Sequence, residues 1–206
     1  TKSYTAMKLK EDDKIVDVKK AFEKTLIVSE TGYYLSYDSK EIPLVGAKAS
    51  GVKGINLKDD IVISGLSYSS SDEYINLFTN RNTAKRIKLS DLNSLSRAKR
   101  GSTLIKKVKS TPYLIKKAFI SNSKDMFVLV MDDEVKEIKN SEISIMDDSS
   151  TGSIVAKNLT DVYRKQNINE IKENEVLEEE LELPKKKSDE EIKELTIDDF
   201  LNDFKI

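Results

Sequence analysis

The sequence predicts an all-β fold built from repeats, and three observations support this prediction. Three glycines, Gly51, Gly101 and Gly152, follow one another at intervals of 50 and 51 residues. An alternating run of β-branched, aromatic and other apolar residues precedes each glycine by about 25 positions, as expected of a short strand. A polar turn follows each run. Four short strands per unit, repeated about every fifty residues, are typical of a propeller-like array rather than of a sandwich.

Each repeat opens with a predicted hairpin. The first strands of the hairpins are expected at residues 25–29, 74–78 and 126–130. The more polar second strands are expected at residues 33–37, 84–89 and 135–138. The turns between them occupy residues 30–32, 80–82 and 132–134. Gly32 and Asn82 stand where a tight turn needs a positive φ, which favours hairpins at these positions.

The second half of each repeat follows the anchor glycine. In the first repeat it is expected to consist of a third strand at residues 52–57, an acidic turn, and a fourth strand at residues 61–65. Residues 7–16 match this half 48 positions upstream. We therefore expect strand material in residues 7–20 that completes an upstream blade, and a chain that begins inside an earlier repeat of a longer protein. The predicted domain, residues 1–163, divides into blades at residues 22–70, 71–121 and 124–163.

The composition excludes several kinds of chemistry. The 206 residues contain no Cys and no His, which excludes disulfides, a thiolate nucleophile, the common zinc sites and an imidazole general base. No apolar run approaches the roughly 20 residues that span a bilayer, and no signal peptide is recognisable. We therefore expect a soluble, cytosolic protein with no membrane partner and no metal site.

Charge is distributed unevenly, although 35 Lys and Arg residues nearly balance 36 Asp and Glu residues. Residues 81–120 contain twelve Lys or Arg residues and a single acid, Asp91. A basic field of this kind attracts polyanions, of which nucleic acid is the commonest. The alternative interpretation is a solvated, Lys-rich surface that has no partner.

The tail, residues 164–206, is a separate segment by composition. It is acidic and poor in apolar residues, so we expect it to be largely disordered. A short helix is expected at residues 197–204, where four apolar residues are spaced at i, i+3, i+4 and i+7. One apolar stripe on a short acidic helix has the form of a docking peptide.

Four segments carry a resemblance to a known family. They are residues 29–33, 45–57, 83–87 and 96–101. Their order and period resemble those of the C-terminal repeats of the A subunits of bacterial type II topoisomerases, and the resemblance extends over roughly residues 1–163. It implies a β-pinwheel, which is a propeller-like disc whose blades exchange strands with their neighbours and whose basic rim bends and wraps duplex DNA.

Two members of this family compete, DNA gyrase and topoisomerase IV. Gyrase carries a box of the form Gln-Arg-Arg-Gly-Gly-Lys-Gly in its first blade, and no such string occurs in this chain. Residues 96–101 resemble that box only in part. The residues around Gly51 are more similar to the topoisomerase IV A subunit of low-GC Gram-positive bacteria. The resemblance therefore favours topoisomerase IV, with gyrase as the alternative.

The resemblance also implies a parent enzyme. That enzyme would be an ATP-dependent type II topoisomerase, an isomerase associated with the nucleoid, which decatenates DNA and relaxes supercoils during chromosome segregation. Its partners would be double-stranded DNA, the ATPase B subunit of a heterotetramer, and the remainder of the A subunit. No catalytic residue and no cofactor is expected in this chain, since ATP and Mg²⁺ would bind elsewhere in the enzyme. A propeller-like scaffold for protein interactions is the alternative from another class.

Contacts to DNA are expected from the basic residues of the first two repeats. Each phosphate that Lys or Arg neutralises releases counterions, so such a surface binds without reading bases. Bending a site of 20–30 base pairs costs about 1–6 kcal/mol, which several phosphate contacts can offset. Acids dominate the third repeat, so it is expected to contribute little. The expected contacts are Lys48, Lys53, Arg81, Lys85, Arg86, Arg97, Lys99, Arg100, Lys106, Lys107, Lys109, Lys116 and Lys117.

Overall fold

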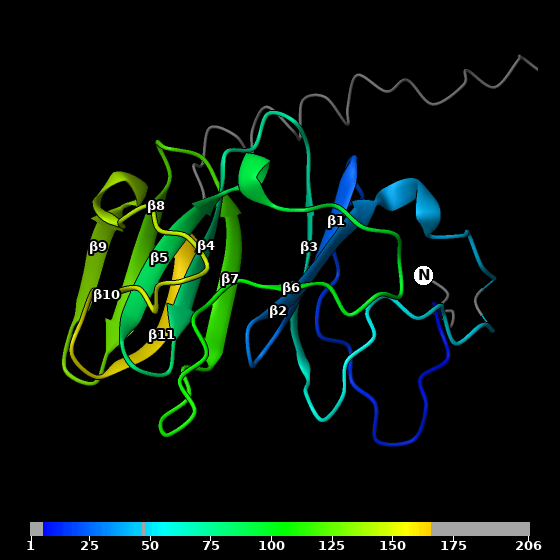
Figure 1. Cartoon of the computed structure of the whole chain (residues 1–206), viewed down its shortest axis with the longest axis horizontal. Coiled ribbons are helices and arrows are strands. Elements are labelled where there is room, and N and C mark those ends of the chain that lie inside the picture. The colour runs from blue at the N-terminus through cyan, green and yellow to red at the C-terminus, as the bar shows by residue number, and fades with distance from the viewer. Residues whose placement is uncertain (1–5, 47, 166–206) are drawn as a thin grey trace, which may run out of the picture. The chain divides into compact units, whose positions relative to one another are not determined.

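The computed structural model describes residues 6–46 and 48–165, and these residues form three antiparallel sheets (Figure 1). The strands are short, and the helices among these residues are three single-turn 3-10 helices. The predicted all-β class is therefore confirmed. Arg164 and Lys165, which were predicted to begin the tail, instead end the last strand. The rest of the predicted tail, including the helix at residues 197–204, lies outside the described residues.

Each sheet is built around one of the predicted hairpins. The first sheet has the strand order β3 (Val62–Tyr68), β1 (Lys24–Ser29), β2 (Tyr33–Asp38) and β6 (Ser102–Thr103). The second has the order β10 (Ser153–Ile154), β5 (Thr83–Lys88), β4 (Tyr74–Thr79) and β7 (Ile115–Ser121). The third has the order β11 (Leu159–Lys165), β8 (Met126–Met131) and β9 (Val135–Lys139). A 3-10 helix follows the second strand of each hairpin, at η1 (Ser39–Glu41), η2 (Leu89–Asp91) and η3 (Asn140–Glu142).

The hairpins form where the alternation of apolar residues predicts them. The turn residues Gly32 and Asn82 have φ values of +90° and +60°, as a tight hairpin turn requires. Register follows the alternation, with Leu26 opposite Ser36 in the first hairpin and Asn76 opposite Arg86 in the second. The hairpin turns lie at one end of the sheets and the 3-10 helices at the other (Figure 1).

The outer strands β6 and β10 are exchanged between repeats. β6 belongs to the second repeat, yet it pairs with β2 of the first, with Tyr33 opposite Thr103. β10 of the third repeat pairs in the same way with β5 of the second, with Ser153 opposite Ala84. The expected exchange of strands is therefore present. The third sheet has only three strands within the described ranges, so the expected four-stranded blade is found in two of the three sheets.

Two predicted strands are wrong. Residues 52–57 and residues 7–20 contain no strand. A strand needs a backbone partner, and the segment after an anchor glycine pairs with the sheet of the preceding repeat rather than with its own sheet. Residues 17–22 contact the edge of β3 by single hydrogen bonds instead of a ladder, from Gly65 N to the Asp17 carboxylate (3.3 Å) and from Phe22 N to Ser67 Oγ (2.7 Å).

The anchor glycines allow the exchanged strand to cross close to its neighbour. Gly101 and Gly152 have φ values of +77° and +89°, where other residues are strained. A Cβ atom on Gly101 would lie 1.7 Å from the carbonyl oxygen of Tyr34, and one on Gly152 would lie 2.8 Å from that of Ala84. At Gly101 and Gly152 the period of about fifty residues thus reflects a repeated contact between an exchanged segment and the strand beneath it.

Apolar side chains fill the space between successive sheets. One buried cluster joins the first and second sheets and includes Leu26, Val28, Ile75 and Leu77, all of them fully buried. A second joins the second and third sheets around three phenylalanines whose ring centroids lie 5.4–6.0 Å apart, namely Phe78, Phe119 and Phe127. Both faces of the second sheet are therefore buried, and a basic side chain on its strand β5 can lie inside the protein rather than on the surface.

Candidate nucleic-acid interface

The side chain of Lys85 is buried in the second sheet and is not available to DNA, so that prediction is wrong. Only 1% of the residue is exposed. Its ammonium group donates hydrogen bonds to the carbonyl oxygens of Asp147 (2.5 Å) and Ser150 (2.9 Å), which precede the exchanged strand β10. Burial lowers the pKa of Lys85 to about 8. Lys85 therefore fixes the crossover between the second and third sheets.

Arg97 has a structural role at the crossover between the first and second sheets. Its guanidinium group donates hydrogen bonds to the carbonyl oxygens of Glu41 (3.1 Å) and Lys53 (2.6 Å), and its backbone N–H donates to the Glu41 carboxylate (2.7 Å). Lys53 is exposed and donates from Nζ to Asn56 Oδ1 (2.7 Å). Arg97 therefore ties the loop before Gly101 to the two segments that flank Gly51.

Two other predicted contacts are partly neutralised by acids. Lys116 Nζ lies 2.9 Å from the carboxylate of Glu30, and Lys117 Nζ lies 3.2 Å from that of Asp161. Exposed pairs of this kind contribute little to stability. They do lower the net positive charge that the strand β7 offers to a phosphate.

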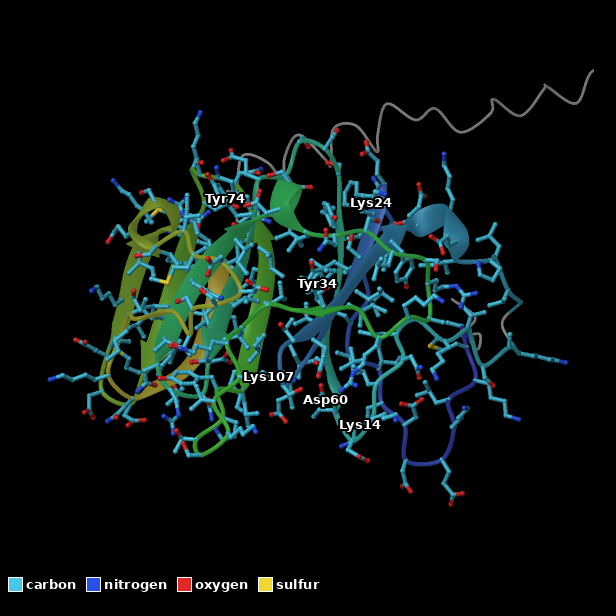
Figure 2. The ribbon with its side chains drawn as sticks, viewed as in Figure 1. Lys14, Lys24, Tyr34, Asp60, Tyr74 and Lys107 are labelled. Carbon is cyan, nitrogen blue, oxygen red and sulfur yellow. The ribbon has the colours of Figure 1, made fainter. Side chains whose placement is uncertain are left out.

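Arg86 lies at the end of the second sheet away from the hairpin turn. Its guanidinium carbon lies 4.6 Å from the ring centroid of Tyr74, the first residue of β4. In Figure 2, Tyr74 lies near the opposite end of the strands from Lys107. The structure therefore separates Arg86 from the basic residues near the hairpin turns.

At the hairpin end of the first two sheets, cations and tyrosine rings gather on the surface. The side chains of Arg100 and Lys107 both lie against Tyr33, with the guanidinium carbon 4.5 Å and the ammonium nitrogen 3.6 Å from the ring centroid. Arg81 lies 4.9 Å from the ring centroid of Tyr113. We call these five residues the hairpin-end cluster. Its three cations are exposed.

The loop of residues 106–113 connects the two halves of the hairpin-end cluster. It carries Lys107 towards the first hairpin and Tyr113 towards the second. Backbone hydrogen bonds fix its end, since Asn80 N donates to the Leu114 carbonyl oxygen (2.9 Å) and Ile115 N to that of Glu30 (2.8 Å). Lys106 and Lys109 are exposed in the same loop. Both hairpins therefore hold this basic loop between them.

The cations of this surface are not neutralised by neighbouring carboxylates. The ion pairs found within residues 6–46 and 48–165 involve none of the exposed basic residues of the cluster and its loop, nor Lys48, Lys53 and Lys99. The pKa of Tyr33 is lowered, first by hydrogen bonding to Lys107 and further by Lys107 and Arg100 as nearby positive charges. The physical cause is that the positive charges of Lys107 and Arg100 favour the ionised form of the phenol.

Sequence reasoning did not find the tyrosines of this surface. Tyr33 and Tyr113 stand beside strands, where a role in the core or rim is the ordinary expectation. The signal that would have identified Tyr33 is its place opposite the exchanged strand β6. Tyr33 faces the exchanged residue Thr103, and Arg100 and Lys107 flank that exchanged strand. This contact becomes visible only once the exchange of strands is known.

The hairpin turn of the third repeat is acidic. It consists of Asp132, Asp133 and Glu134, and it lines a hollow of about 460 Å³ together with residues 155–158. The hairpin turns therefore differ in charge along the array, since the second carries Arg81 and the third carries three acids. Any polyanion is expected to contact the first two repeats more closely than the third.

The repeats, the hairpins and the exchanged outer strands together define a propeller-like array of the pinwheel type. Comparison with known proteins agrees with this class. The family model described as "DNA gyrase C-terminal domain, beta-propeller" matches residues 1–21, 23–66 and 73–111, which is about half of the chain. The chain belongs to this family.

Topoisomerase IV proteins are among the curated relatives of the chain. The A subunit of DNA topoisomerase 4 from Bacillus subtilis (strain 168) is 36% identical over 157 residues, which cover 74% of this chain and 19% of that protein. The same protein of Streptococcus pneumoniae is 34% identical over 165 residues, which are 79% of this chain and 19% of that protein. The chain thus spans about a fifth of the length of these relatives.

Solved structures give the same result for the fold. The C-terminal domain of a DNA topoisomerase IV matches with a TM-score of 0.75 and 31% identity, over 86% of this chain and 58% of that one. A DNA gyrase A C-terminal domain matches with a TM-score of 0.68 over 78% of this chain and 57% of that one, but with 23% identity, so this likeness concerns the fold alone. Within the described part of the chain, no helix has the length and hydropathy needed to cross a membrane.

Proposed function

We propose that this chain binds and bends duplex DNA as the C-terminal domain of the A subunit of a bacterial topoisomerase IV. The observation that carries the proposal is the hairpin-end cluster with its loop, where five exposed cations lie together without an acidic partner among the described residues. Such a surface suits the phosphate backbone, which duplex DNA presents at about one charge per 1.7 Å of axis. The topoisomerase IV names of the relatives support the choice of enzyme over gyrase.

In the parent enzyme this domain would hold DNA rather than cut it. We infer that decatenation and supercoil relaxation use ATP and Mg²⁺ bound elsewhere, in an ATPase B subunit and in the remainder of the A subunit within a heterotetramer. The domain would then supply curvature to the DNA near the nucleoid. Contacts on two successive repeats can offset the cost of bending, about 1–6 kcal/mol for a short site.

The test is the salt dependence of binding to duplexes of unrelated sequence. We expect similar affinity for two unrelated 40-base-pair duplexes in fluorescence anisotropy, with the logarithm of the association constant falling linearly with the logarithm of salt concentration. A triple Gln variant of the surface should lower the slope by about three, since each lost phosphate contact changes it by about one. A triple Gln control of equal charge change should leave it unaltered. The surface variant replaces Arg81, Lys106 and Lys109, and the control replaces Lys14, Lys19 and Lys20.

Two results would count against DNA binding by this chain. Absence of binding to either duplex at about 50 mM salt would favour a scaffold for protein interactions. Equal changes in slope for the surface and control variants would show that total charge decides binding and that the surface has no special part in it.

A further inference from the structure

The most specific arrangement on the basic surface is the group of Tyr33, Arg100 and Lys107. Arg100 Nη2 donates a hydrogen bond to the Tyr33 hydroxyl (2.9 Å), and its guanidinium carbon lies 4.5 Å from the ring centroid. Lys107 Nζ lies 3.6 Å from the same centroid. One ring thus orders two flexible cations that come from opposite ends of the exchanged segment.

The exchange of strands creates this arrangement. Tyr33 is the first residue of β2 and stands opposite Thr103 of β6. Arg100 precedes Gly101, and Lys107 follows the buried pair Leu104 and Ile105. The two cations reach the tyrosine only when the exchanged segment lies on β2, so the strand contact and the charge pattern depend on each other.

The equivalent position on the second sheet lacks all three groups. The fifty-residue period places Thr83, Thr151 and Asn158 where the first sheet has Tyr33, Arg100 and Lys107. Thr83 Oγ1 donates there to the carbonyl oxygen of Thr151 (2.8 Å), a contact that closes the crossover without charge. The fold therefore does not require a tyrosine and two cations at this crossover, and their presence on the first sheet calls for a function.

We propose that Tyr33, Arg100 and Lys107 form a site on this protein that binds a backbone phosphodiester of duplex DNA, and that Tyr33 is a positioning residue in this site. This inference rests on the proposed function and specifies where the backbone is held. Arg presents a planar fork of donors to phosphate oxygens, and Lys adds a compact charge beside it. The ring limits the freedom of both side chains, so less entropy is lost when a phosphate binds.

The test compares variants of the 206-residue chain for binding to a 40-base-pair duplex across a salt series. Arg100→Gln with Lys107→Gln should lower the salt slope by about two. Tyr33→Leu keeps both charges but removes the ring, and it should weaken binding about tenfold near 0.1 M salt, the effect of about one lost contact. Tyr33→Phe keeps the ring and should fall between Tyr33→Leu and the wild type.

The control is Tyr163→Leu. Tyr163 is exposed, and Lys117, the cation over its ring, lies 5.8 Å from the centroid and already pairs with Asp161. This variant should bind DNA like the wild type. Thermal unfolding of every variant, followed by circular dichroism, separates a loss of contact from a loss of fold.

A double-variant comparison distinguishes positioning from a general structural effect. In the background of Arg100→Gln with Lys107→Gln, adding Tyr33→Leu should change affinity no further, because there is no cation left to position. Additive loss in that background, or wild-type affinity in Tyr33→Leu alone, overturns this site while leaving DNA binding intact. Failure of the wild type to bind duplex DNA overturns both proposals.

Discussion

Replacement of the anchor glycines should show how strongly each exchanged strand depends on close backbone contact. Gly51, Gly101 and Gly152 all have positive φ, so Ala at any of them pays about 1–2 kcal/mol of backbone strain. The surroundings of the three differ. A Cβ atom on Gly51 would meet nothing within 4 Å, whereas one on Gly101 would lie 1.7 Å from the Tyr34 carbonyl oxygen.

The expected magnitudes follow from this difference. Gly51→Ala should lower the free energy of unfolding by about 1–2 kcal/mol, the strain alone. Gly101→Ala cannot be accommodated by a side-chain movement, because the clash is with backbone atoms of β2. The exchanged segment must move, which exposes part of Leu104 and Ile105, each 1% exposed in the fold. Since burial of each such side chain contributes about 1.5–3 kcal/mol, we expect a total loss of at least about 3 kcal/mol.

Urea denaturation followed by far-ultraviolet circular dichroism measures these losses. Gly152→Ala should lie between the other two variants, because its Cβ atom would approach the Ala84 carbonyl oxygen to 2.8 Å rather than 1.7 Å. Equal destabilisation by Gly51→Ala and Gly101→Ala would show that the backbone contact with β2 contributes nothing, since strain at positive φ would then account for the whole effect.

Two further predictions concern buried polar groups. Asn140→Leu should lower the free energy of unfolding by about 1–3 kcal/mol, because it removes the acceptor for Asn76 Nδ2 (2.7 Å). Adding Asn76→Leu should recover part of this loss, because the equivalent positions between the first two sheets are Leu26 and Leu89. Additive losses in urea denaturation would contradict this prediction. Lys85 should make stability rise between pH 8 and pH 10 relative to Lys85→Met. Its pKa of about 8 in the fold is below the value of about 10.4 in an unfolded chain, so the unfolded state binds the extra proton in that range; a constant difference between the two proteins from pH 7 to pH 10 would disprove it.

The hairpins could be predicted because their information is local. Alternation of apolar residues, together with Gly32 and Asn82 at positive φ, determines β1 with β2 and β4 with β5 within a residue at most boundaries. The basic character of residues 81–120 was equally plain from the sequence, since charge is a property of composition. The repeat period revealed the anchor glycines, although not the reason for them.

Strand exchange could not be read from the repeats themselves. The segment after Gly101 has the apolar residues of a strand whichever sheet receives it, and only the tertiary structure shows that it pairs with β2. The prediction of a strand at residues 52–57 failed for this reason, because the sequence holds no signal for which backbone will be the partner.

The pattern of residues along the chain was enough to establish a repeated, all-β array with a basic centre. Which of the basic residues reach the surface depends on how the sheets pack. Alternation distinguishes two faces of a strand, but both faces of β5 are buried between neighbouring sheets. Lys85 therefore lies inside, at the position that Leu35 occupies one repeat earlier, while Arg100 and Lys107 meet on Tyr33 at the surface. The physical reason is that burial and cation contacts depend on residues about fifty to seventy positions apart, which only the exchange of strands brings together.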